Sequence, residues 1–108
     1  MFGLGIKNEY QLVVEFADDS VEYFQRVTDM ELLLHDKLQS GKVDGNDVGQ
    51  GIVNIFVFTK QPKQCFEEMM GYFKPAQLEP SAVAYRDVDG EDYFRLWPAN
   101  DKTPFKLK

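Results

Sequence analysis

The longest apolar run of the chain, residues 50–60 (QGIVNIFVFTK), constrains the fold more than any other segment. It is rich in β-branched and aromatic residues, which are enriched in strands. A continuous run of this kind is typical of a central strand that is covered on at least one face. The sequence therefore predicts a β-sheet built around a strand over residues 52–59.

The segments before the central strand predict one strand and one helix. We expect a strand over residues 9–17, because apolar residues alternate with positions of mixed character. A capping box that begins at Thr28 precedes an apolar stripe and predicts a helix over residues 28–39, which Gly41 ends. An earlier capping pair leaves residues 20–27 open as either helix or loop.

The segments after the central strand predict a second helix and a hairpin. Pro62 stands at the first position of this helix, which ends before the next proline because the residue preceding a proline avoids the helical region. Asp89 and Gly90 separate two further strands, over residues 82–87 and 92–97. This dipeptide is typical of a two-residue hairpin turn.

Together with a short strand at residues 42–44, the predicted order is strand, helix, strand, strand, helix, strand, strand. Two helices can cover only one face of an antiparallel sheet, so we expect an α+β fold, a two-layer sandwich of ferredoxin-like type. A chain of 108 residues forms a single domain. We expect its core over about residues 9–98, with a flexible N-terminal arm (residues 1–8) and a flexible C-terminal tail (residues 99–108).

We expect the helices to pack on one sheet face, formed by Leu12, Val14, Phe16, Val53, Ile55, Val57, Phe94 and Leu96. The opposite sheet face, without helices, is where we expect binding residues. Strand alternation places the following candidates there: Asn54, Phe56, Phe58, Arg86, Tyr93, Arg95 and Trp97. Arginine beside aromatic rings is typical of recognition surfaces. Asn54 stands in an otherwise apolar strand and needs a hydrogen-bond partner if this face is buried. The face either closes a homodimer, is covered by the chain termini, or binds a partner protein or a small ligand.

Residues 44–51 (DGNDVGQG) form the second candidate site. Their glycine, aspartate and asparagine content is typical of a turn whose polar side chains bond to their own backbone. A polar site built from Asp44, Asn46 and Asp47 is the alternative. It is not a calcium loop, because Val48 occupies the third ligand position.

Composition opposes several functions. The net charge of −6 opposes binding to a phosphate backbone, so we expect no nucleic-acid partner, whereas a basic partner would be attracted. The N-terminus lacks the features of a signal peptide, and no run is long enough to span a membrane, so we expect a cytoplasmic protein. Cys65 and His35 are the only residues of their types, which favours neither a metal site nor a Cys-His pair. Cys65 flanks the apolar stripe of the second helix, so we expect a buried, inert thiol, and we expect His35 at the surface of the first helix. We expect no cofactor.

Two strings, DGNDVGQGIVNIFVFTKQPKQCFE and AYRDVDGEDYFRLWP, resemble a group of small bacterial proteins of unknown function. Members of that group show Asp-Gly before a Gly-x-Gly turn, then a strand like NIFIFT, then a helix started by proline. The resemblance covers about residues 28–97. It implies an α+β sandwich of ferredoxin-like type and a bacterial source, and it implies no catalytic residues. This chain departs from the group at Lys60 and Gln61, where the group has acidic helix caps.

The sequence thus predicts a small non-enzymatic binding or regulatory protein that uses the uncovered sheet face for self-association or partner binding. One alternative, by analogy with other small acidic bacterial proteins, is a toxin-neutralising immunity-type protein whose acidic loops meet a basic partner. Another is a small enzyme or metabolite-binding protein, in which Asp44 and Asp47 act with Arg86 or Arg95 as an anion clamp. No pair of nucleophile and base supports that last alternative.

Overall fold

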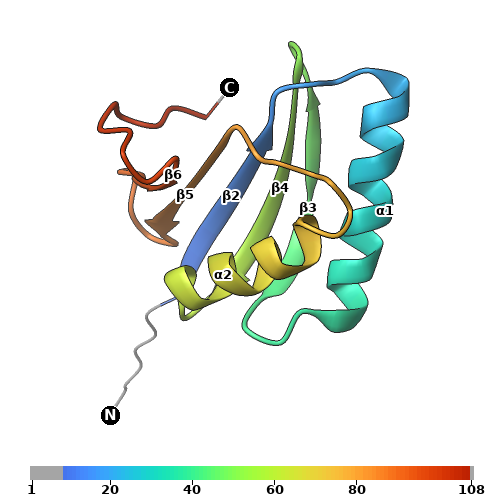
Figure 1. The fold of residues 1–108 in the computed structure, drawn as a ribbon. Coiled ribbons are helices and arrows are strands. Elements are labelled where there is room, and N and C mark those ends of the chain that lie inside the picture. The colour runs from blue at the N-terminus through green and yellow to red at the C-terminus, as the bar shows by residue number, and fades with distance from the viewer. Residues whose placement is uncertain (1–8, 108) are drawn as a thin grey trace.

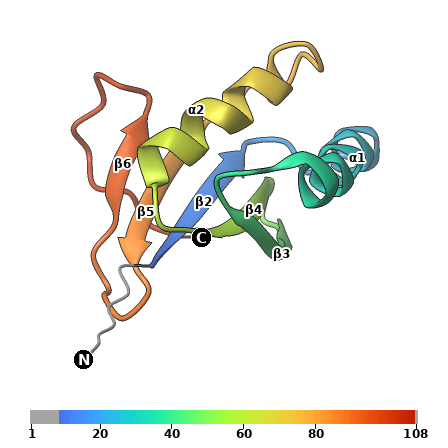
Figure 2. The same cartoon turned by 90° about the horizontal axis from the view of Figure 1, so that it is seen from below.

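The computed structural model describes residues 9–107, and its two helices pack on one face of a five-stranded antiparallel sheet (Figures 1 and 2). The elements are, in chain order, β2 (Tyr10–Phe16), α1 (Val21–Lys37), β3 (Lys42–Gly49), β4 (Ile52–Thr59), α2 (Pro62–Phe73), β5 (Ala82–Asp87) and β6 (Phe94–Trp97). The strand order is β3-β4-β2-β5-β6, and each neighbouring pair is antiparallel. The predicted α+β class is confirmed. The seven-element order with its fifth strand, β6, differs from the predicted ferredoxin-like type. The predicted N-terminal arm lies outside the described residues.

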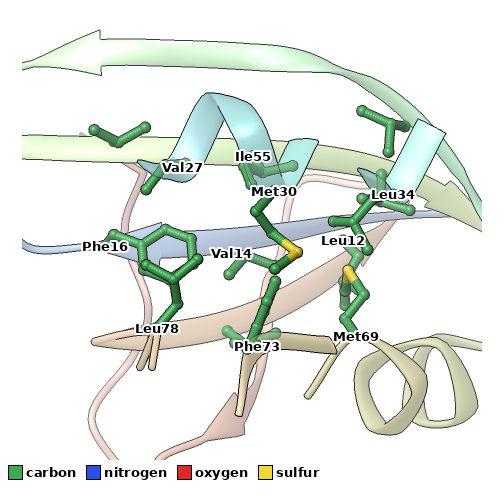
Figure 3. Packing of buried hydrophobic residues seen from close by; sticks show 14 of the residues in the cluster. Leu12, Val14, Phe16, Val27, Met30, Leu34, Ile55, Met69, Phe73 and Leu78 are labelled. Atoms are coloured by element: carbon green, nitrogen blue, oxygen red, sulfur yellow. The ribbon is translucent and has the colours of Figure 1, made fainter. Parts of the chain in front are cut away.

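The main core lies between the sheet and the two helices (Figure 3). The central strands contribute alternate residues, as predicted: Leu12, Val14 and Phe16 from β2, and Val53, Ile55 and Val57 from β4. The helices contribute Val27, Met30 and Leu34 from α1, and Cys65, Met69 and Phe73 from α2. Phe94 was expected in this core, but it is 57% exposed because β6 lies at the sheet edge.

The first helix begins seven residues before its predicted start. Its N-cap is Ser20, whose hydroxyl accepts a hydrogen bond of 3.3 Å from the backbone N–H of Tyr23. The prediction of a start at Thr28 was wrong, because fully buried Val27 extends the apolar stripe by one more turn. The segment left open as helix or loop is therefore helical.

Gly41 does not end this helix, which stops at Lys37, but it permits a close approach of the chain to α2 and β4. A Cβ atom at this position would lie 2.8 Å from Sγ of Cys65 and 2.9 Å from Cγ1 of Val57. Those distances are shorter than van der Waals contact, so the glycine is required by packing.

Residues 42–49 form an eight-residue edge strand, so the prediction of a mainly turn-like segment was wrong. A β-bulge between Val43 and Gly45 leaves Asp44 without a partner on β4. The turn itself is short: Gln50 and Gly51 have φ values of 57° and 80°, which suit a two-residue hairpin. The tight, bulged connection that the sequence predicted is confirmed. Pairing with β4 outweighs the local turn preference.

Glu68 of α2 holds the segment that follows α1. Its carboxylate accepts hydrogen bonds from the backbone N–H of Gln39 at 3.0 Å and of Ser40 at 2.9 Å, and from the Ser40 hydroxyl at 2.5 Å. Burial alone would raise the pKa of Glu68. The hydrogen bonds favour the ionised form more strongly, so the pKa lies below its ordinary value of 4.5.

We expect Glu68→Ala to lower the free energy of unfolding by about 1 kcal/mol at neutral pH, since solvent screens part of the interaction. A lowered folded-state pKa means that this contribution is fully present above the unfolded-state value, near 4.5, and is lost as the pH falls through the folded-state value. Urea unfolding at about pH 7 and about pH 3 measures it, with the exposed neighbour Glu67→Ala as control. A Glu68→Ala deficit of the same size at both pH values would contradict this account.

Candidate functional site

We use the term far face for the side of the sheet that faces away from α1 and α2. The strand registers place these residues on it: Lys42, Gly45, Asp47 and Gly49 of β3, Ile52, Asn54, Phe56 and Phe58 of β4, Gln11, Val13 and Glu15 of β2, Ala82, Ala84 and Arg86 of β5, and Arg95 of β6. Most of the predicted binding residues therefore share one face. The predicted residues that lie elsewhere, and the hydrogen bonds and packing contacts of those that lie here, decide which part of the far face is open to a partner.

Trp97 is the exception in the predicted set, and its placement on the far face was wrong. Regular alternation would pair Val83 with Leu96. A bulge in β6 pairs Val83 with Trp97 instead. The ring consequently turns to the helix side, where it lies 6.3 Å from the ring of Phe66 and its Nε1 donates to the Pro80 carbonyl at 3.0 Å. With Met70 and Leu78 it lines a groove of about 540 Å³.

The C-terminal tail covers the β5–β2 half of the far face, running back across the sheet from β6 (Figures 1 and 2). Phe105 is the anchor: it is 7% exposed and packs with Val13, Ala82 and Ala84, and Phe56 of β4 packs against the edge of the same cluster. Its ring also lies 5.1 Å from that of Tyr93. Tyr93 is therefore part of the contact between tail and sheet.

Arg95 ties the same tail to β6. Its guanidinium donates to the Thr103 carbonyl at 3.1 Å and to the Trp97 carbonyl at 3.3 Å, and it lies 3.7 Å from the carboxylate of Asp101. The guanidinium carbon also stands 5.7 Å from the centre of the Phe105 ring. The donors of this predicted binding residue are thus used within the chain.

Arg86 has a similar internal role in the β5–β6 connection. Its Nε donates to Oε1 of Gln11 at 3.1 Å, and its Nη1 donates to the carbonyls of Asp87, Val88 and Gly90 at 3.2, 3.0 and 3.0 Å. The backbone N–H of Gly90 also bonds to the Asp87 carbonyl, which makes the turn earlier and wider than predicted, and β6 begins at Phe94.

The two arginines and the acidic residues of β3 are not brought together. Between β3 and β5 lie β4 and β2, so Asp47 and Arg86 stand three strand spacings apart, roughly 14 Å. Asp44 lies in the bulge, and Asn46 points to the helix side, where its Nδ2 donates to Oε1 of Glu31 at 2.5 Å. The predicted cluster of Asp44, Asn46 and Asp47 is therefore divided between two faces.

The β3–β4 half of the far face carries a row of hydrogen-bond acceptors, Asp47, Asn54 and Glu15, which we call the acceptor row. Asn54 is paired with Asp47 on one side and with Glu15 on the other, so the three side chains are neighbours. Glu15 is 9% exposed, and its Oε1 accepts a hydrogen bond of 2.7 Å from the Ser81 hydroxyl.

Asn54 itself is 2% exposed, and its Oδ1 has no hydrogen-bond partner among the described residues. Such an orphan acceptor is uncommon, because the great majority of buried polar side-chain atoms are bonded. Beside the row, Phe56 and Phe58 are half-buried on the same strand. An oxygen that lacks a donor thus lies on the same strand face as two partly exposed aromatic rings, with Phe56 two residues away and Phe58 four.

The sequence analysis missed three contributors to this region. Glu15 and Ser81 carry no motif and are joined to Asn54 only by the register of β2. Phe105 lies in a segment without any periodic pattern, so only its isolated aromatic character could have marked it as an anchor.

The remaining chemical candidates are separate from this region. Cys65 is fully buried, and burial raises the pKa of its thiol, so it is an inert core residue as predicted. His35 is exposed on α1, also as predicted. Within residues 9–107, no three histidine, cysteine, aspartate or glutamate side chains are grouped as metal ligands. No helix in that range has the length and apolar character to cross a membrane.

No protein-family model, curated protein or solved structure matches this chain, so the geometry above is the basis for assigning a function.

Proposed function

We propose that this chain is a non-enzymatic binding protein that holds a protein partner on the β3–β4 half of its far face. The observation that carries the proposal is the buried Oδ1 of Asn54, which has no partner among the described residues. An unsatisfied buried acceptor costs about 1–3 kcal/mol of stability. This oxygen is closed to solvent, so a partner reaches it when the Asn54 side chain turns toward the surface, and a hydrogen bond donated there would recover that cost on binding.

The surroundings of Asn54 support the proposal. Phe56 and Phe58 supply half-buried aromatic surface beside a polar centre, a combination that is common in the most important contacts of protein interfaces. Asp47 is exposed on the edge strand β3, and the whole chain carries a charge of −6. These charges favour a basic partner and speed its approach.

Two finer assignments belong to this proposal. The strand order β5-β2-β4-β3, with one helix in each crossover, supports a ferredoxin-like unit to which β6 and the tail were added. The single cysteine supports a cytoplasmic location, because disulfides are rare in that compartment.

Photo-crosslinking tests the proposed surface. A photoreactive amino acid that replaces Phe58 is expected to form one discrete adduct with another protein in the cell that produces this chain. The same amino acid at Leu32, which is exposed on α1 and faces away from the sheet, is the matched control and is expected to form none.

Other outcomes would overturn the proposal. An adduct with twice the mass of the chain would show that the surface closes a homodimer, and equal adducts at both positions would show non-specific contact. If position 58 forms no adduct while the variant keeps the thermal midpoint of the wild type, the far face does not hold a protein.

A further inference from the structure

We infer that the group which the partner inserts beside Asn54 is the guanidinium of an arginine side chain. This inference rests on the proposed function, because it names the chemistry that the same surface would recognise. It follows from the shape of the space beside Asn54, the character of the atoms around it, and the absence, within residues 9–107, of an ion pair to the acceptor row.

The space is a cavity of about 120 Å³ at the end of the β3–β4 hairpin. Its lining consists of Asp47, Val48, Gly49, Gln50, Ile52 and Asn54. A water molecule occupies about 30 Å³, so this volume holds about four non-hydrogen atoms. A guanidinium group has that number of atoms, whereas a nucleotide or a sugar is far larger than the cavity.

The atoms around the cavity accept hydrogen bonds and carry negative charge. Asp47 lines it with a carboxylate, Asn54 lines it with a side chain whose Oδ1 is buried and has no partner among the described residues, and the buried carboxylate of Glu15 stands next in the acceptor row. An anion would be repelled here. A neutral hydroxyl or amide would satisfy one acceptor and leave the charge of the row uncompensated.

No cation of the described residues pairs with this row. Lys42 shares the far face, but it lies opposite Phe58, four residues along β4 from Asn54. The ion pairs within residues 9–107 join Lys37 to Asp36 and Arg95 to Asp101, and neither Asp47 nor Glu15 takes part. The only hydrogen bond to the Glu15 carboxylate in that range comes from the Ser81 hydroxyl. A positive charge must therefore come from outside this part of the chain.

Arginine fits the row better than a compact cation. Neighbouring strands are about 4.8 Å apart, so the acceptors are spread along a line across the sheet. A guanidinium presents five donors in a rigid plane and bonds to carboxylates through two of them at once. One arginine can thus bond to Asp47 and, when the Asn54 side chain turns its buried Oδ1 toward the cavity, to that oxygen as well, while its charge lies toward Glu15.

An NMR titration of the full ¹⁵N-labelled chain tests this inference. The probe is N-acetylarginine methylamide, and its matched control is N-acetylcitrulline methylamide, which has the same shape without the charge. We expect the arginine compound to shift the side-chain amide of Asn54 and the backbone amides of Gln50 and Gly51, with an affinity at least about tenfold above that of the citrulline compound. Equal affinities, or shifts that leave these amides unchanged, would overturn it.

Variants on β3 separate a specific site from general attraction to an acidic surface. Asp47→Asn is expected to weaken binding of the arginine compound by about tenfold. Asp44→Asn removes the same charge from the bulge of the same strand and is expected to leave the affinity unchanged. Equal losses in the two variants would overturn the inference, since they would indicate long-range attraction only.

The two proposals fail in different ways. If position 58 crosslinks a partner and the arginine compound leaves Asn54 unshifted, only the arginine inference is wrong. If the arginine compound binds and no partner adduct forms at position 58, the chain recognises a guanidinium but the partner-binding function is wrong.

Discussion

Replacing Phe105 by alanine is expected to lower the free energy of unfolding by about 2–4 kcal/mol and to release the tail from the far face. The ring is 7% exposed, and it covers Val13, Ala82 and Ala84. Its removal leaves those residues in contact with water and deprives Tyr93 of its stacking partner. The loss is large because the tail has no regular secondary structure and depends on this one apolar contact and on Arg95.

Urea unfolding measures the change in stability, and hydrogen exchange of residues 101–107 measures the release of the tail. Leu107→Ala is the matched control, since this side chain is exposed on the same tail, and we expect a change within about 0.5 kcal/mol. If Phe105→Ala costs no more than the control, the tail does not seal the face and a larger surface is open to partners.

Replacing Asn54 by valine is expected to have the opposite effect on stability, raising the free energy of unfolding by about 1–2 kcal/mol. The substitution removes the orphan Oδ1, and a β-branched side chain suits a central strand. For a domain of this size, such a gain raises the thermal midpoint by roughly 4–12 °C. The same variant is expected to lose binding of the arginine compound, because the central acceptor of the row is gone.

Calorimetry and the NMR titration together check this prediction. Asn46→Val is the matched control: it removes an asparagine whose Nδ2 is bonded to Glu31 and is expected to reduce stability slightly. A clear loss of stability in Asn54→Val, comparable to that of other buried hydrogen-bonding residues, would show that Asn54 is satisfied within the chain. In that case it would be a structural residue with no role in binding.

Asn54→Val is expected to raise the free energy of unfolding and Phe105→Ala to lower it, because the two halves of the far face differ. The tail seals the β5–β2 half with apolar packing, and the β3–β4 half keeps an acceptor that costs stability. Retained polar groups that destabilise a fold are typical of functional sites.

Local pattern predicted much of the fold. Strand β4 begins and ends at the predicted residues, and so does β5, because each is an apolar segment bounded by turn residues. Alternation along β2 and β4 correctly separated the helix side from the far face. The start of α1 was missed, since two capping signals compete locally and only the burial of Val27 against the sheet decides between them.

The site was predicted in parts that only the sheet joins. Asn54 and Asp47 were both candidates, but they belonged to separate predicted sites, and the β3–β4 register makes them neighbours. Arg86 and Arg95 were expected to face a ligand, but nearby backbone carbonyls use their donors. Trp97 faces the helices because one bulge reverses the alternation of β6.

The sequence by itself determined which segments are strands or helices and which face of each central strand is apolar, because these properties depend on residues a few positions apart. Tertiary structure alone decided which polar groups find partners. Hydrogen bonds and bulges depend on distances between segments remote in the chain, as between Glu15 and Ser81 or between Phe105 and Val13. Whether Asn54 is satisfied is a property of that assembled surface, and no local pattern carries it.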